Sequence, residues 1–176
     1  MLPGHATFRN LSRYSASYER TFARWYARDF DLVSLTKAAI TQVIPPEHEQ
    51  AVVIDASVVP TSGKKTYGLD RFWNGSHSRT EQGWEISTLA WLDMTENCAD
   101  CRSVAQTPPT DKTTDSEATR MDIYRDQLAH VVSEHRPSHL RYVVTDGYYS
   151  KQKFTGGVRD LGLEQIGKLR IDAHLR

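Results

Sequence analysis

The chain has 176 residues, with 22 basic and 22 acidic side chains and a formal net charge of +0 at pH 7. This length suits one domain with a hydrophobic core, with or without a small helical addition. A neutral total does not exclude nucleic acid as a partner, because the local distribution of charge decides such binding. No apolar run approaches the roughly 20 residues that span a bilayer, and the N-terminus lacks a signal-peptide pattern. We therefore expect a cytoplasmic protein that does not bind a membrane.

The first 47 residues predict a small helical unit. Residues 1–10 show no clear period, whereas aromatic side chains from Tyr18 to Phe30 recur on one face of a helix. A second helix is expected from Leu32 to Ile44, because two prolines follow it. Beside the aromatic face, three arginines share a helical spacing: Arg20, Arg24 and Arg28. This stripe is either a solvated surface or a ridge that contacts DNA phosphates.

A second unit is predicted over residues 48–176, and it begins with a strand from Ala51 to Ser57. Small and branched apolar residues run directly into Asp55, which is typical of a central strand buried on both faces. A buried carboxylate is costly unless a metal ion, an arginine or a helix terminus meets it. The strand end is therefore the first candidate for a functional site.

The residues after this strand combine cations with aromatic side chains. We expect a basic loop there, which contains Lys64, Lys65, Arg71 and Arg79. Cations interleaved with aromatics suit a nucleic-acid strand that crosses an active site. The alternative is a solvated hairpin tip.

Two further strands are predicted, from Glu85 to Asp93 and from Cys98 to Ala105. Turns and loops rather than helices join the first three strands, which indicates antiparallel pairing. A helix follows, and Thr114 and Glu117 match a capping box at its start.

The last part of the chain repeats the pattern of the first strand. A buried strand from Leu140 to Thr145 leads into Asp146. A helix that Ser150 caps and a short strand over residues 163–169 complete the predicted elements.

This order of elements, βββαβαβ, is the ribonuclease-H-like arrangement, a mixed α/β fold with helices packed on a mixed sheet. In that topology the first and fourth strands lie side by side, which brings Asp55 close to Asp146. Adjacent carboxylates repel each other unless a divalent cation lies between them, and their oxygens suit Mg²⁺ or Mn²⁺. Two such ions roughly 3.5–4 Å apart activate a water or a 3′-hydroxyl for attack on a phosphodiester. The alternative is that both acids form caps or salt bridges at loop ends.

The only cysteines, Cys98 and Cys101, form a single CxxC. A zinc site with downstream histidines, His130, His135 or His139, is one hypothesis. A redox thiol pair is another. Two ordinary, half-buried small residues are the third interpretation.

Several short motifs together resemble bacterial insertion-sequence transposases of the DDE class. They are Asn10–Ser15, Asp55-Ala56-Ser57, Ser62–Gly68, Phe72–Gly75, Gln106-Thr107-Pro108 and Val144–Tyr149. The resemblance covers nearly the whole chain. It implies a ribonuclease-H-like catalytic core that cuts and rejoins DNA at transposon ends. By this resemblance, Asp55 and Asp146 correspond to the first two acids of the family's triad and bind Mg²⁺ or Mn²⁺. The resemblance also implies a protein associated with the nucleoid, where it can act as a homo-oligomer on DNA.

The resemblance is incomplete at its end. The family's third acid is a glutamate on a helix beyond the fifth strand, and Glu164 does not match that motif. We therefore expect the front part of a transposase, inactive or impaired, with exposed apolar surface that favours aggregation. The alternative function is a non-catalytic DNA-binding or regulatory remnant.

Overall fold

A computed structural model describes residues 7–63, 66–109 and 119–169. The chain divides into two compact units, Met1–Asp31 and Leu32–Arg176. Within the described part, no helix is both long and apolar enough to cross a membrane.

The N-terminal unit contains two short helices, α1 (Phe8–Arg13) and α2 (Glu19–Tyr26). The sequence did not predict α1, which begins where the Thr7 hydroxyl accepts a hydrogen bond from the Asn10 amide at 3.2 Å. α2 is shorter than predicted, because after Tyr26 the backbone turns more tightly and the Arg28 amide bonds the Trp25 carbonyl at 3.1 Å. The predicted aromatic face of this helix is largely exposed.

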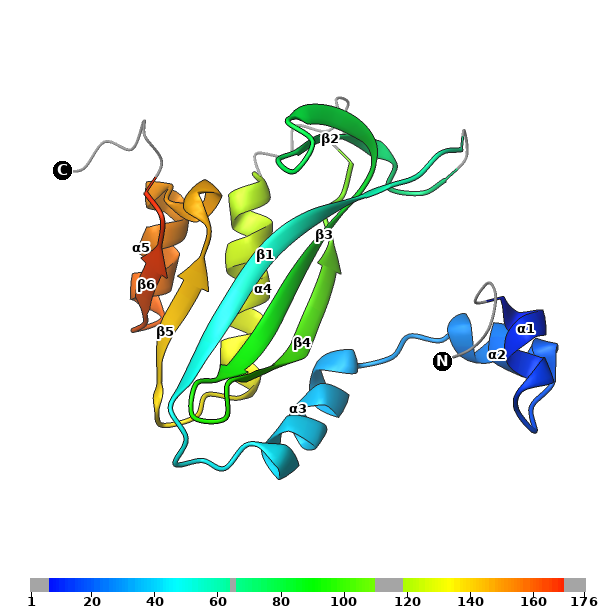
Figure 1. The fold of residues 1–176 in the computed structure, drawn as a ribbon, viewed down its shortest axis with the longest axis horizontal. Helices are drawn as coiled ribbons and strands as arrows, with labels where there is room; N and C mark the ends of the chain where they lie inside the picture. The colour runs from blue at the N-terminus through cyan, green and yellow to red at the C-terminus, as the bar shows by residue number, and fades with distance from the viewer. Residues whose placement is uncertain (1–6, 64–65, 110–118, 170–176) are drawn as a thin grey trace. The chain divides into compact units, whose positions relative to one another are not determined.

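The second unit is built on one mixed sheet with the strand order β2-β3-β1-β5-β6, and β4 also pairs with β3. Figure 1 shows β1 between β3 and β5. β1 pairs antiparallel with β3, and β3 with β4, whereas β1, β5 and β6 are parallel. This is the predicted ribonuclease-H-like arrangement. The strands are β1 (Gln50–Pro60), β2 (Asp70–Asn74), β3 (Arg79–Asp93), β4 (Cys98–Gln106), β5 (Leu140–Thr145) and β6 (Glu164–Gly167).

β2 is an addition that the sequence analysis treated as loop. It forms a hairpin with the first residues of β3, from the pair Asp70↔Gly83 to the pair Asn74↔Arg79. The turn passes through Ser78, whose φ of 51° lies in the left-handed region. The basic loop predicted from the sequence is therefore, in part, an ordered hairpin.

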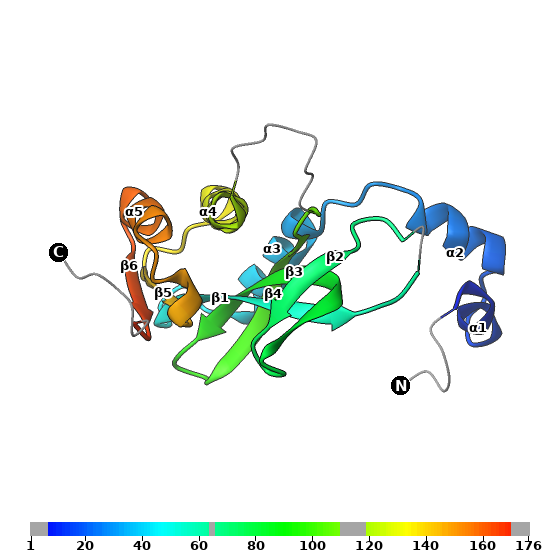
Figure 2. The ribbon, with the colours of Figure 1, turned by 90° about the horizontal axis from the view of Figure 1, so that it is seen from above.

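Three helices pack on the sheet: α3 (Leu32–Val43), α4 (Arg120–Glu134) and α5 (Gln152–Asp160). All three contribute side chains to one hydrophobic core with β1, β3 and β5, and α4 and α5 lie on the same side of the sheet in Figure 2. The sequence grouped α3 with the N-terminal helices up to residue 47. In the structure, Ile40 and Ile44 of this segment are buried in the sheet's core, and Thr36 bonds the Arg102 carbonyl of β4 at 2.9 Å. α3 therefore packs with the second unit.

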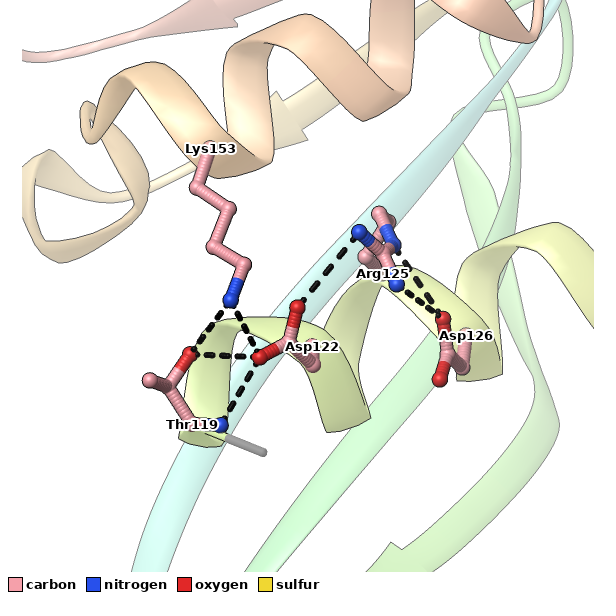
Figure 3. Close-up of polar contacts among 5 residues, drawn as sticks. All are labelled: Thr119, Asp122, Arg125, Asp126 and Lys153. Atoms are coloured by element: carbon pink, nitrogen blue, oxygen red, sulfur yellow. Dashed lines mark hydrogen bonds and ion pairs between the residues drawn. The ribbon is translucent and has the colours of Figure 1, made fainter. Parts of the chain in front are cut away.

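The predicted capping box, Thr114 with Glu117, lies outside the described residues. In the described part of the chain, α4 begins with a capping box of Thr119 and Asp122. Figure 3 shows Lys153 of α5 reaching the Asp122 carboxylate at 2.5 Å. Hydrogen bonds from Lys153 and Thr119 lower the pKa of Asp122. This carboxylate thus links the first turn of α4 to α5.

The two faces of the sheet differ. Along β1, Val52 and Ile54 are buried in the core, so the intervening Val53 and Asp55 point to the opposite face. On that face β3 presents only partly buried side chains, from Ile86 to Leu92 in alternate positions. The helix-free face is therefore accessible in the described part of the chain.

Candidate metal and nucleic-acid site

The ends of β1 and β5 position the two predicted acids. The strands are parallel, and Val53 pairs with Val144. Asp55 and Asp146 each come two residues after these partners. Continuing the register sets the two aspartates opposite each other on the same face of neighbouring strands. The structure thus brings them together as the topology predicted.

The electrostatics support this proximity. Burial raises the pKa of Asp55, and the negative charge of Asp146 raises it further, against a hydrogen bond from the Ala56 amide that lowers it. The Asp146 carboxylate accepts a hydrogen bond from the Tyr148 amide at 2.9 Å and caps the short helix η1 (Gly147–Tyr149). The hydrogen bond therefore orients Asp146. The raised pKa means that Asp55 binds a proton more readily than a free aspartate, unless a cation compensates its negative charge.

Both aspartates line one pocket of about 640 Å³. Its walls come from the outer half of β1, the β2–β3 hairpin, the first residue of α4 and η1. They include Asp55, Ser57, Trp73, Asn74, His77, Glu85, Arg120, Asp146, Tyr148 and Tyr149. A chain of nucleotides that entered this pocket would meet carboxylates and aromatic rings together.

A buried polar group that the sequence analysis missed forms part of the pocket wall. The carboxylate of Glu85 accepts a hydrogen bond from the Tyr124 hydroxyl at 2.6 Å and pairs with Arg120 at 3.4 Å. Neighbouring Tyr149 is 1% exposed, and its hydroxyl has no hydrogen-bond partner among the described residues. Burial, followed by the charges of nearby groups that include both aspartates, raises the pKa of Tyr149, so this hydroxyl stays a donor. Because these residues are far apart in the sequence, no local pattern could have revealed them.

The hairpin at the pocket's rim is held by one acid. The carboxylate of Glu81 accepts hydrogen bonds from Asn74 at 2.7 Å and Arg79 at 2.7 Å, and it contacts His77 at 2.9 Å. These contacts, with His77 the largest cause, lower the pKa of Glu81 to about 2. The Glu81 carboxylate is therefore charged at neutral pH and links Asn74, His77 and Arg79 around the turn.

The predicted DNA-contacting cations are distributed over both units. Arg71 is exposed on β2, and Arg79 is exposed but paired with Glu81 at 2.6 Å. Lys64 and Lys65 lie outside the described residues. The N-terminal stripe, Arg20, Arg24 and Arg28, is exposed, but Arg28 lies beyond α2 and over the Trp25 ring. None of the described cations of this set lines the pocket, and a role in DNA binding stays a prediction for all of them.

The zinc and redox hypotheses gain no support from the structure. Cys98 and Cys101 are exposed free thiols. The described residues contain no group of three histidine, cysteine or acidic side chains placed to hold a metal ion. His135 ends α4, and burial followed by the charges of Arg102 and Lys37 lowers its pKa. His135 therefore lies at the C-terminal end of α4.

Two carboxylates suit a site for Mg²⁺ or Mn²⁺. Mg²⁺ binds through one or two carboxylates together with waters and substrate phosphates. Asp55 and Asp146 supply such a pair. Glu85 also lines the pocket, but its carboxylate pairs with Tyr124 and Arg120, and the described residues contain no group of three such side chains placed to hold a metal ion. The donor set therefore fits one hard divalent cation that a phosphate group completes.

The chain is similar in sequence to a known protein family. The family model of the DDE superfamily endonuclease matches residues 14–176. No curated protein matches the chain in sequence.

Three solved structures illustrate distant similarity. The piggyBac transposase synaptic complex with hairpin DNA has 13% sequence identity and a TM-score of 0.46 over 70% of this chain. Ciona intestinalis Endonuclease V in complex with a DNA containing an inosine has 10% identity and a TM-score of 0.40 over 85% of this chain. The Mos1 transposase paired-end complex has 10% identity and a TM-score of 0.35 over 92% of this chain. The chain spans 23%, 57% and 54% of the respective proteins.

Proposed function

The chain belongs to the DDE superfamily endonuclease family, and from this premise we propose that it is the catalytic core of a DNA transposase. Its proposed activity is divalent-metal-dependent cleavage and transfer of DNA strands at transposon ends. The observation that carries the proposal is the pair of carboxylates, Asp55 and Asp146, on adjacent parallel strands in one pocket. We also propose a bacterial insertion sequence as the source, the cytoplasmic nucleoid as the setting and a homo-oligomer on DNA as the assembly.

In this proposal Asp55 and Asp146 hold Mg²⁺ or Mn²⁺. A bound ion of this kind polarises the scissile phosphate and activates the attacking oxygen. The chain's own groups do the rest. Asp146 is oriented by the Tyr148 amide, and the buried Tyr149 ring forms part of the pocket wall.

Nicking of supercoiled plasmid DNA tests the proposal directly. Because no residue matches the third acid of the family's triad, we expect weak nicking by the wild-type chain. This nicking should occur only with Mg²⁺ or Mn²⁺ and should be lost in Asp55→Asn and Asp146→Asn. Asp160→Asn is the matched control, because Asp160 is an exposed aspartate outside the pocket. Nicking that survives loss of either pocket acid would refute the assigned site.

The second candidate function is non-catalytic DNA binding. It is favoured by the exposed cations, such as Arg71, that lie outside the pocket. It is also favoured because the described residues contain no third acid placed with Asp55 and Asp146 to hold a metal ion. It predicts salt-sensitive DNA binding that needs no divalent ion and survives replacement of both Asp55 and Asp146. Such binding without any metal-dependent nicking would favour this function over the first.

A further inference from the structure

The strand register places Trp73 on the same face of the sheet as the two acids. Asp55 pairs with Thr88 on β3, and Trp73 pairs with Thr80 on the same strand. Thr80 and Thr88 are eight residues apart, an even number, so their side chains share one face. Phe72, next to Trp73, points to the opposite face: it is fully buried, and the guanidinium of Arg120 in α4 lies 4.8 Å from its ring centroid. The face that Trp73 shares with Asp55 is therefore the one without helices. Trp73 therefore faces the same way as Asp55.

Trp73 also lines the pocket that contains the acids, yet 61% of its surface is exposed. Such exposure of a tryptophan at a concave site is informative, because this residue is usually well buried. The backbone beneath it is rigid. The buried side chain of Phe72 stabilises β2 from the helix-covered face of the sheet. The contacts of Glu81 with Asn74 and His77 stabilise the turn that follows β2. The strand that carries the ring is thus stabilised on both sides of Trp73, while the ring itself stays open to a ligand.

We propose that Trp73 is a stacking platform for an unpaired nucleobase of a DNA strand whose phosphates lie at Asp55 and Asp146. The inference rests on the proposed function for its ligand, and it adds a base-binding residue to that site. Every nucleobase has a flat π-face, so an exposed indole binds it without reading sequence. Arg71, which pairs with Gln82, lies on the same face two residues before Trp73 and is suited to a phosphate of the same strand.

Binding of single-stranded DNA in the presence of Ca²⁺ tests this inference, because a divalent ion offsets the repulsion between the DNA phosphates and the two carboxylates. A fluorescently labelled deoxythymidine oligomer and an abasic oligomer of the same length are titrated with the protein. We expect Trp73→Ala to weaken binding of the base-containing oligomer by about 5- to 150-fold, the usual range for one stacked base. Trp73→Phe should retain most of the affinity. Binding of the abasic oligomer should be the same in the wild type and in Trp73→Ala.

Two control variants separate stacking from other effects. Tyr67 is an exposed aromatic residue outside the pocket, and Tyr67→Ala should bind both oligomers like the wild type. Arg71→Ala should weaken both oligomers and reduce the salt dependence, whereas Trp73→Ala should leave the salt dependence unchanged. Melting curves of Trp73→Ala should match the wild type, because the ring is exposed.

The outcomes decide the inference independently of catalysis. Trp73→Ala binding the base-containing oligomer within twofold of the wild type, or losing affinity equally for the abasic one, would overturn the inference while leaving the proposed chemistry intact. A base-dependent loss in Trp73→Ala would support the inference even if plasmid nicking did not depend on Asp55.

Discussion

Replacing Tyr124 with phenylalanine should lower the free energy of unfolding by about 2 kcal/mol. The side chain is fully buried, and its hydroxyl donates to the Glu85 carboxylate at 2.6 Å. A hydrogen bond to a charged group contributes about 1.5–3 kcal/mol, and its loss leaves a buried carboxylate oxygen without its donor. Phenylalanine fills the volume of the ring, so the cost of a cavity does not enter. For a chain of this size the melting temperature should fall by about 4–8 °C.

Tyr149 provides the matched control. It lies beside Tyr124 with ring centroids 5.3 Å apart, and it is equally buried, but its hydroxyl has no partner among the described residues. Tyr149→Phe should therefore leave the stability unchanged or raise it, because an unpaired buried hydroxyl is unfavourable.

Urea unfolding of both variants, followed by circular dichroism, measures the difference. We expect the urea midpoint to fall for Tyr124→Phe alone. Equal midpoints for the two variants would show that the hydrogen bond to Glu85 does not stabilise the pocket wall, and the reasoning would be wrong.

Three further predictions concern a cap, a glycine and a titration. Thr119→Ala removes the N-cap of α4 and should cost about 1 kcal/mol in urea unfolding; no loss would contradict the capping role. Gly83→Ala should cost about 1–3 kcal/mol, because a Cβ there lies 2.3 Å from a backbone oxygen of β1, whereas Gly75→Ala has open space and should cost far less. In metal-free protein, NMR titration should place the pKa of Asp55 above 3.8, and Asp146→Asn should lower it, because one of the causes of the raised value is removed. The folded state then holds this proton more tightly than the unfolded state, so stability falls as the pH rises through that pKa, and this fall should be smaller in Asp146→Asn.

The pairing of the two acids could be predicted because it follows from topology. Two apolar runs that each end in an aspartate indicate central strands, and the order of elements makes β1 and β5 neighbours. The same reasoning correctly placed the antiparallel pairing of β1, β3 and β4.

Short elements were beyond the sequence analysis. α1 has six residues and β2 has five, and segments this short carry too few repeats of a period to be recognised. β2 forms because Phe72 is buried and because the edge of β3 is available for pairing. Both are tertiary interactions, which a local sequence pattern does not contain.

The capping box and the boundary of the N-terminal unit show a different limit. Thr114 with Glu117 matches the same local pattern as Thr119 with Asp122, so the pattern alone could not single out the pair that begins α4. Asp122 also has a tertiary contact, with Lys153 of α5, that no local pattern contains. Likewise, the periodicity of α3 predicted a helix correctly, but it did not tell which unit the helix packs against.

Binding of Mn²⁺ to the metal-free chain tests the central claim most directly. Isothermal titration of the wild type should show one site whose affinity falls at least tenfold in Asp55→Ala and in Asp146→Ala, and not in Asp160→Ala. The affinity should also fall as the pH is lowered through the raised pKa of Asp55, because the proton competes with the ion. Equal Mn²⁺ affinity in the wild type and in Asp55→Ala would contradict the account.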